Sequence, residues 1–381
     1  MSGESRFLRT VSTFVLRDGK TQFGADESIL DEEKLFRLGL YHQILPLVGQ
    51  YRAELSKAFP NISTDFFEKC RKYAVTNAGR VMLYERFLAN LDSILAQNGI
   101  EYRLFKGPVL AFELYPYPHL RTFGDMDILI REESLEKVHQ ILKSLNCELC
   151  DDLYTVFPNE IIKKYSFARH YATVINPFVA VDVHLSLSGR LHPFQFDVDD
   201  FWNNSRSFRI GDREYRTFDH PHQAIYSLYH AFKHYFFKLI WIMDCQRNFH
   251  LPDFDMDRFE YLLKRYNLSK IREIYKQVVA ELQIGNPDRF DEVRAEHWKL
   301  IPKVNTELIL QGSLPISQAR ARMLLPLLYL PKLRQKAVYL WRQMFPPRDV
   351  VRDFYATREL QPTWRNYFSL RRKAVFELLN D

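Results

Sequence analysis

Glycine, cysteine and long apolar runs are all scarce in this chain of 381 residues. It has 13 glycines, about half the average usage, whereas aromatic residues make up 15% of the chain. This composition excludes a glycine-rich sandwich and a linker-rich array of small modules. The longest apolar stretches, such as residues 324–330, are far shorter than the roughly 18 to 20 residues of a bilayer-spanning helix. We therefore expect no transmembrane helix and no membrane partner.

The four cysteines are too few for the disulfide framework of a small secreted domain. Cys147 and Cys150 form a CxxC pair, but no second pair of cysteines or histidines follows at the spacing of a zinc finger. The N-terminus has no apolar run of signal-peptide length with a cleavage site behind it. Together these absences predict a cytoplasmic protein with reduced thiols.

Positive charge is concentrated near the C-terminus. Residues 301–381 carry 14 basic against six acidic side chains, and the whole chain has a net charge of +6. Aromatic residues are interleaved with the arginines, a composition suited to phosphate backbones and stacked bases. Two interpretations stay open: amphipathic helices with solvated faces, or a surface that binds RNA. The arginines expected to contact a polynucleotide are Arg342, Arg348, Arg365, Arg371 and Arg372.

The periodicity of apolar residues divides the chain into three parts. Apolar residues recur at helical spacing between about residues 26 and 98 and again from residue 220. Between these limits, short apolar runs bounded by turn residues predict strands. The predicted strands are 102–106, 126–130, 171–175, 179–185, 207–210 and 215–218, the last two as a hairpin around Gly211. We therefore predict an α+β protein. Its expected domains are an N-terminal helical region over residues 1–98, a small mixed α/β core over 99–219, and a C-terminal helical region over 220–381.

Two acidic residues stand at the start of the strand predicted at 126–130. Asp125 and Asp127 are two residues apart, so both carboxylates are expected on one face of an extended chain. Adjacent carboxylates repel each other unless water, a proton or a cation compensates their charge. Mg²⁺ prefers oxygen ligands and commonly bridges one or two carboxylates to a phosphate. The alternative is an exposed acidic pair without a metal.

A later strand carries a third carboxylate. Asp182 and His184 share one face of the otherwise apolar strand predicted at 179–185. An unpaired carboxylate in such a strand costs several kcal/mol, so Asp182 needs a partner. If the two strands are neighbours, three carboxylates meet and form a ligand set for divalent metal ions.

A basic turn precedes these acids. Lys106 and Gly107 follow a predicted strand, and Pro108 suits the first turn of a helix. The amides and positive dipole of a helix N-terminus attract phosphate, and Lys106 adds a charge. Arg121 is expected either to hold a phosphate as a bidentate donor or to pair with one of the two acids that follow it.

These residues resemble a known family. A Lys-Gly turn, an arginine before an Asp-x-Asp strand and a later Asp-x-His strand are similar to the uncharacterised nucleotidyltransferase family of the DNA polymerase β-like superfamily, over about residues 100–250. The resemblance implies a Mg²⁺- or Mn²⁺-dependent transfer of a nucleoside monophosphate from an NTP, such as ATP, to an acceptor, with pyrophosphate release. It gives Gly107 the turn position, Asp125 and Asp127 the paired acids, and Asp182 the third acid. Lys106-Gly107-Pro108 stands where the wider superfamily has Gly-Ser.

Two other functions remain open at this point. The chain could be a catalytically silent module of the same fold that binds a nucleotide or RNA. It could also be a metal-dependent hydrolase centred on His230, His234 and Asp244, because His230 and His234 share one face of a predicted helix. The same two histidines could instead line the active site or belong to the core. The acceptor of a transferase could be a small molecule, RNA or a protein.

Overall fold

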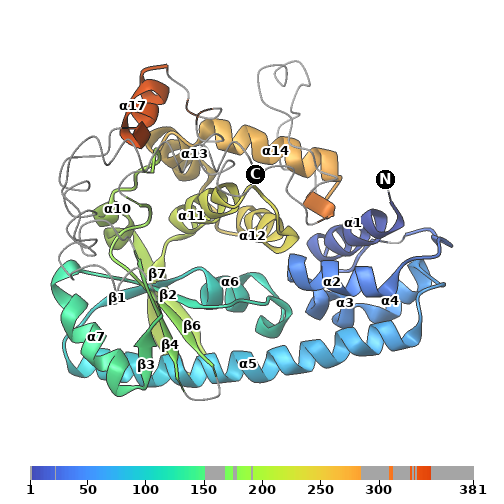
Figure 1. Cartoon of the computed structure of the whole chain (residues 1–381), viewed down its shortest axis with the longest axis horizontal. Helices are drawn as coiled ribbons and strands as arrows, with labels where there is room; N and C mark the ends of the chain where they lie inside the picture. Colours follow the sequence, from blue (N-terminus) through green and yellow to red (C-terminus); the bar gives the residue numbers. More distant parts are fainter. Residues whose placement is uncertain are drawn as a thin grey trace.

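The computed structural model describes residues 2–21, 23–150, 168–174, 178–189, 192–284, 309–311, 327, 330 and 333–344. The N-terminal part is helical, and its first four helices lie at one end of the molecule (Figure 1). The helices of this part are α1 (Gly3–Leu16), α2 (Glu32–His42), α3 (Leu45–Gln50), α4 (Arg52–Ala58) and α5 (Thr64–Gln97). The last of these runs from the N-terminal helices to the underside of a β-sheet.

The sheet of the described residues is mixed and has the strand order β3-β4-β5-β2-β1-β7-β6. The strands are β1 (Tyr102–Phe105), β2 (Met126–Ile130), β3 (Cys147–Leu149), β4 (Ala168–Thr173), β5 (Ala180–His184), β6 (Ser205–Ile210) and β7 (Arg213–Phe218). At the centre of the sheet, β2 pairs in parallel with β5 and antiparallel with β1. Two short 3₁₀ helices, η1 (Pro118–Leu120) and η2 (Glu132–Ser134), precede and follow β2.

Each face of the sheet belongs to a different apolar cluster. Side chains on successive residues of a strand point to opposite faces. Met126, Ile128 and Ile130 of β2 pack with the second half of α5 and with α7 (Leu135–Ser144), whereas Leu129 belongs to the cluster of the N- and C-terminal helices. The opposite face, which also carries Asp127, is therefore turned toward the C-terminal helices.

Helix α5 belongs to both clusters. Ser63 caps its N-terminus by accepting a hydrogen bond from the amide of Phe66, and its first turns pack on α3. A Cβ on Gly49 of α3 would lie 2.8 Å from the backbone of Cys70, so glycine permits the close approach of the two helices. Farther along α5, a second buried stripe packs under the sheet and comprises Val81, Tyr84, Leu88, Leu91 and Leu95.

The C-terminal part is again helical. Its described helices are α11 (His220–Lys233), α12 (Leu239–Phe249), α13 (Met256–Arg265), α14 (Ser269–Leu282) and α17 (Leu333–Met344), and α10 (Val198–Asn203) precedes them, between β5 and β6. A short helix, α6 (Gly107–Leu114), leaves β1 and packs against α12.

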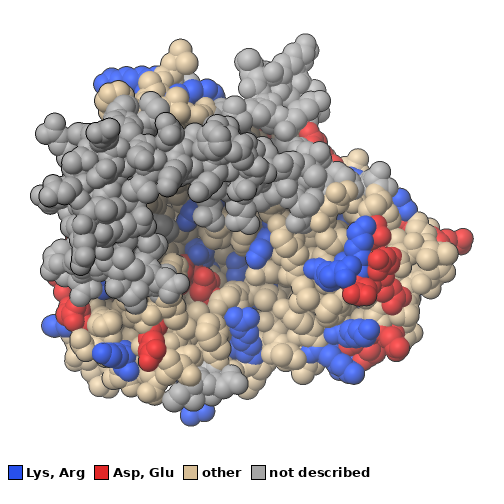
Figure 2. Space-filling view, viewed as in Figure 1, with Lys and Arg blue, Asp and Glu red and all other residues tan. Residues whose placement is uncertain are grey.

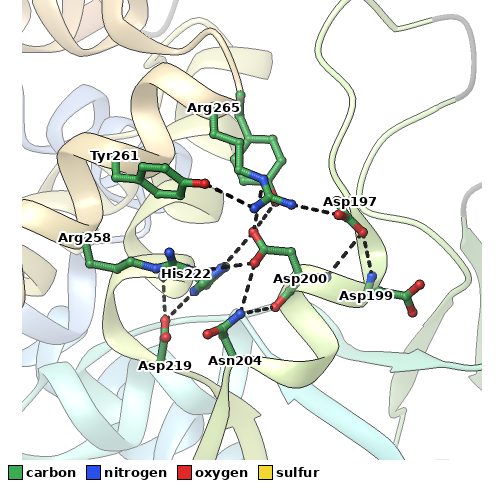
Figure 3. Close-up of polar contacts among 10 residues, drawn as sticks. Asp197, Asp199, Asp200, Asn204, Asp219, His222, Arg258, Tyr261 and Arg265 are labelled. Atoms are coloured by element: carbon green, nitrogen blue, oxygen red, sulfur yellow. Dashed lines mark hydrogen bonds and ion pairs between the residues drawn. The ribbon is translucent and has the colours of Figure 1, made fainter.

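A cluster of hydrogen bonds and ion pairs connects α10 to α11 and α13 (Figure 3). The imidazole of His222 is fully buried between two carboxylates, with Nδ1 2.6 Å from Asp219 Oδ1 and Nε2 3.3 Å from Asp200 Oδ2. Tyr266 donates a hydrogen bond of 2.5 Å to Asp200, and Arg265 lies 2.8 Å from Asp197. Because each acid has partners inside the protein, we interpret this cluster as structural.

The predicted α+β class is confirmed, with a mixed sheet between helical regions. The strand predicted at 126–130 is β2, and the predicted hairpin is β6–β7, with Gly211 in the turn at φ 55°. Helix α1 and strand β3 were not predicted. The three-domain division stays a prediction, and one apolar cluster draws residues from each of the three proposed domains. Within the described residues, no helix has the length and hydrophobicity needed to cross a membrane.

Candidate active site

The turn between β1 and α6 has an unusual backbone. Lys106 has φ 55° and ψ −126°, a conformation that costs a residue with a side chain about 1–3 kcal/mol. A Cβ on the next residue, Gly107, would lie 2.6 Å from the carbonyl oxygen of Asp125. Only glycine fits here without movement of the backbone. The Lys-Gly pair that the sequence singled out therefore brings the N-terminus of α6 against the start of β2.

The adjacent strands bring two of the predicted acids together. Asp127 is opposite Asp182 in the parallel β2–β5 pair, and Phe105 is opposite Asp127 on the other side. The expectation that the two acidic strands are neighbours is thus confirmed. Because Asp182 and His184 are two residues apart on β5, His184 lies on the same face as both acids.

Asp127 is completely buried and has two basic partners on one oxygen. Its Oδ1 lies 2.7 Å from Lys106 Nζ and 2.9 Å from His184 Nε2, whereas Oδ2 has no hydrogen-bond partner. Burial alone would raise the pKa of Asp127, but the charge of Lys106 and the hydrogen bond to His184 lower it to about 2. The carboxylate is therefore ionised at neutral pH, and one of its oxygens has no hydrogen-bond partner.

Asp127, Asp182 and His184 form a group that suits a metal ion. One possible ligand atom from each residue lies within 4.8 Å of those of the others, and all three residues are buried. Across the parts of the chain that the structure describes, no other group of three His, Cys, Asp or Glu residues meets this geometry. Asp182 Oδ1 also accepts a hydrogen bond of 2.6 Å from Nδ1 of His170 on β4. His170 was not proposed from the sequence, because its position opposite Asp182 depends on strand register.

Asp125 lies near this group but outside it. Burial, followed by the neighbouring carboxylate of Asp127, raises the pKa of Asp125 to about 6. The two acids of the Asp-x-Asp motif therefore have opposite pKa shifts, since the pKa of Asp127 is lowered.

Tyr84 connects the start of β2 to β5. This residue of α5 donates a hydrogen bond of 2.6 Å to the carbonyl of Gly124 and accepts one of 3.1 Å from the amide of Ala180. The hydroxyl of Tyr84 therefore links the residue before Asp125 to the first residue of β5.

Arg121 takes the ion-pair role rather than the role of a free phosphate donor. Its Nε and one terminal nitrogen lie 2.8–3.1 Å from the carboxylate of Asp244 on α12, and its other terminal nitrogen donates to the carbonyl of Gly107. Tyr115 donates a further hydrogen bond to Asp244. The expected partner was Asp125 or Asp127, so the acid is a different one. Because Asp244 is paired with Arg121, it is not available as the third metal ligand that the hydrolase hypothesis requires.

A cavity of about 470 Å³ opens beside these groups. The residues that line it come from four segments. These are the β1–α6 turn, residues 121–125, the end of α2 with the loop after it, and the connection between α11 and α12 with the adjoining helix ends. Basic side chains surround a hollow in the middle of the face shown in Figure 2. The lining residues that the sequence did not indicate as functional include Tyr41, Gln43, Lys233, Phe237, Lys238 and Trp241. Four of these follow His230, and the only sequence signal for them is the two lysines that flank the aromatic run.

His230 and His234 line this cavity. Their ring centroids are 4.7 Å apart, and each ring packs against Trp241. Burial and the positive charges of Lys106 and other neighbours hold the pKa of His230 well below its ordinary value, so it is neutral at pH 7. No third ligand accompanies the pair among the described residues. The cavity-lining interpretation is therefore favoured over a zinc site.

The proposed RNA-binding arginines are not placed. Arg348, Arg365, Arg371 and Arg372 lie outside the described residues, as does the side chain of Arg342 in α17. RNA binding by this region stays a prediction.

A comparison with protein families finds a match over most of the chain. The model described as an uncharacterised nucleotidyltransferase matches residues 29–282, well over half of the chain. The match includes the Lys-Gly turn, the three acids and the cavity-lining residues of α11 and α12, and it extends beyond the resemblance over residues 100–250 into the N-terminal helices. None of the curated proteins compared with the chain matches it.

Proposed function

Because the chain belongs to the uncharacterised nucleotidyltransferase family, we propose that it transfers a nucleoside monophosphate from an NTP to an acceptor, with release of pyrophosphate. The observation that carries this proposal is the contact of the Asp127, Asp182 and His184 group with Lys106, whose turn with Gly107 lines the cavity. A metal ligand set and a phosphate-binding turn then lie close enough to act on one triphosphate.

The residues present fit a divalent cation. Asp127 has a buried oxygen without a partner, and Asp182 and His184 add an oxygen and a nitrogen donor. Carboxylate oxygens suit Mg²⁺, and the imidazole is also compatible with Mn²⁺. We propose Asp127 and Asp182 as ligands, with Asp125 as a third acid and His184 as a further donor. The bound metal would neutralise phosphate charge and make the acceptor hydroxyl more acidic.

In the proposed reaction, the oxygen of an acceptor hydroxyl forms a bond to the α-phosphorus of the NTP. The bond from that phosphorus to the oxygen bridging to the β-phosphate breaks, and pyrophosphate leaves. Lys106 and the N-terminus of α6 orient the triphosphate through charge and backbone amides. The Asp182 carboxylate takes up the hydroxyl proton and then releases it to water, while His170, whose side chain is half exposed, holds the carboxylate through its hydrogen bond.

The alternative is a nucleotide- or RNA-binding module without turnover. Nucleotide or RNA binding needs a basic cavity or surface but no reactive metal centre. The close group of two buried carboxylates and an imidazole favours the enzyme, because burying such charges without a function destabilises the fold.

The test is transfer from each of four α-labelled NTPs with Mg²⁺ or Mn²⁺ and cell extract as the source of acceptor. Asp127→Asn should lower transfer more than about 100-fold, because the ligand charge is lost while the shape is kept. Asp253→Asn changes an exposed acid and is the matched control. Chelation of the metal should abolish transfer by the wild type. Unchanged transfer by a folded Asp127→Asn variant would contradict the metal assignment. NTP binding without product from any extract fraction would favour the module.

A further inference from the structure

We propose that the corner between α11 and α12, residues 233–241, binds the β- and γ-phosphates of the nucleotide, which leave as pyrophosphate. This inference rests on the proposed function and adds a subsite to it. The ligand class is an inorganic polyphosphate or the polyphosphate end of a nucleotide. Lys238 and Lys233 are the proposed anion-binding groups, and Trp241 is a positioning residue for Lys238.

The first argument is the charge of the cavity. Four basic residues contribute to its lining, namely Lys106, Arg121, Lys233 and Lys238, whereas Asp125 is the one acidic residue among the lining residues. Lys106 is paired with Asp127, and Arg121 with Asp244. The other two lysines both lie on the α11–α12 side. The wall opposite the Lys-Gly turn is therefore positively charged, as a polyanion requires.

The second argument is the environment of Lys238. It is partly buried, and it has no ion-pair partner among the described residues. Burial lowers the pKa of its ammonium group, and Asp125, too far away for an ion pair, raises it by a smaller amount. Removing a charge from water without a counter-ion is unfavourable. A bound phosphate would supply the missing negative charge.

The third argument is that the position of Lys238 is fixed. Its Nζ lies 5.0 Å from the ring centroid of Trp241, within the range of a cation–π interaction. His230 and His234 pack on the same indole, with centroid distances of 5.0 and 4.9 Å. Because these three side chains surround the ring, we assign Trp241 to holding the lysine rather than to stacking with a nucleotide base.

The backbone of the corner directs both lysines to one cavity. Tyr235 and Phe236 have φ values of 58° and 57°, so two successive residues with side chains adopt the left-handed conformation. The amide of Phe236 donates to the carbonyl of Ala231, and the side chain of Phe236 is buried against Tyr275. Strained backbone held by surrounding packing is frequent at binding sites. The reversal places Lys233, at the end of α11, and Lys238, before α12, on the same wall.

The experiment measures binding of pyrophosphate and tripolyphosphate to the full chain by calorimetry, without added metal. Lys238→Gln should weaken binding of both probes at least about tenfold, since a buried charge-assisted contact is lost. Lys238→Arg should bind within a few-fold of the wild type. Lys264→Gln, at an exposed position of α13, is the matched control and should change nothing. Binding of a nucleoside monophosphate should be the same in all variants. Equal pyrophosphate affinity in the wild type and Lys238→Gln would overturn the proposal.

A second measurement needs no variant. Acylation of lysines is followed by mass spectrometry with and without pyrophosphate, and protection is expected at Lys238 but not at Lys264. Equal labelling of Lys238 in both conditions would also overturn the proposal. An effect of Lys238→Gln on transfer that depends on acceptor concentration, with unchanged pyrophosphate binding, would assign the corner to an anionic acceptor instead.

The metal-free assays separate this proposal from the proposed function. Polyphosphate binding that depends on Lys238, without transfer in any extract, would support the subsite and contradict the enzyme. Transfer that depends on Asp127 but not on Lys238 would do the reverse.

Discussion

The two walls of the cavity differ in how they compensate charge. On the strand wall, Lys106 is paired with Asp127 and Arg121 with Asp244, and all four side chains are mostly or fully buried. On the helical wall, Lys238 faces the same cavity without a carboxylate partner in the described part of the chain. Internal ion pairs fix the geometry of the strand wall, whereas the helical wall has charge available for a ligand. The difference predicts that equivalent substitutions affect folding on one wall and binding on the other.

The largest expected effect on folding comes from breaking the Arg121–Asp244 pair. Arg121→Met should lower the free energy of unfolding by about 3–5 kcal/mol, because it leaves a buried carboxylate without its counter-ion. The double variant Arg121→Met/Asp244→Leu should recover much of this loss, since neither charge is then buried alone. Urea denaturation gives both values. A single variant as stable as the wild type would show that the strand wall does not depend on this pair.

A smaller effect is expected from His42, which supports the helical wall. Its Nε2 lies 3.1 Å from the carbonyl oxygen of Leu310, and its Nδ1 accepts a hydrogen bond of 3.4 Å from the amide of Leu239, next to Lys238. Burial lowers the pKa of His42 to about 4, whereas an unfolded histidine has a pKa near 6.5. Between these values only the unfolded chain takes up the proton. The contribution of His42 to the free energy of unfolding should therefore be fully present above about pH 6.5. It should fall by about 3 kcal/mol as the pH decreases to about 4.

His42→Gln isolates this contribution. Burial also lowers the pKa of His192 to about 4 and holds that of His230 well below its ordinary value, so the wild type should lose stability through all three histidines. The variant should show a shallower loss of unfolding free energy over the same pH range, measured by urea denaturation at a series of pH values. Identical pH slopes in the two proteins would contradict the assignment to His42.

The smallest expected change in stability is at Lys238. Lys238→Met removes an ammonium group that has no carboxylate partner among the described residues, so the free energy of unfolding should stay within about 1 kcal/mol of the wild type or increase. The same variant should lose polyphosphate affinity. Thermal unfolding beside the binding assay tests both statements. A destabilisation as large as that of Arg121→Met would remove the distinction between the two walls.

The sequence predicted the parts of the site that depend on local pattern. Asp127 was identified because it is paired with Asp125 at the start of an apolar strand, Asp182 because it interrupts another apolar strand, and Gly107 because it stands between a strand and a proline-initiated helix. A parallel pairing of the two strands was enough to bring the acids together. The family resemblance rests on the same local patterns.

The sequence did not predict contacts between distant residues. Asp244 is 123 residues from Arg121, and no periodicity indicates that α12 packs against the β1–α6 turn. Lys233 and Lys238 look like ordinary helix-flanking lysines, because their common direction depends on two left-handed residues that are not glycine. His170 lies opposite Asp182 because of the register of the β4–β5 pair, which the sequence alone did not indicate. Each of these features depends on tertiary packing, which local sequence patterns do not encode.

The continuity of α5 has a consequence for the width of the cavity. The helix packs on α3 near Cys70 and under the sheet from Val81 onward. Because both packing regions lie on one continuous helix, the rotation of one about the helix axis fixes the rotation of the other. One inserted residue between them would rotate one packing region by about 100° relative to the other. A seven-residue insertion would nearly restore the phase but move them about 10 Å apart. The separation between the Tyr41 side of the cavity and Asp127 on β2 therefore depends on the number of residues in α5. Insertions or deletions in this stretch are expected only where they preserve the helical phase.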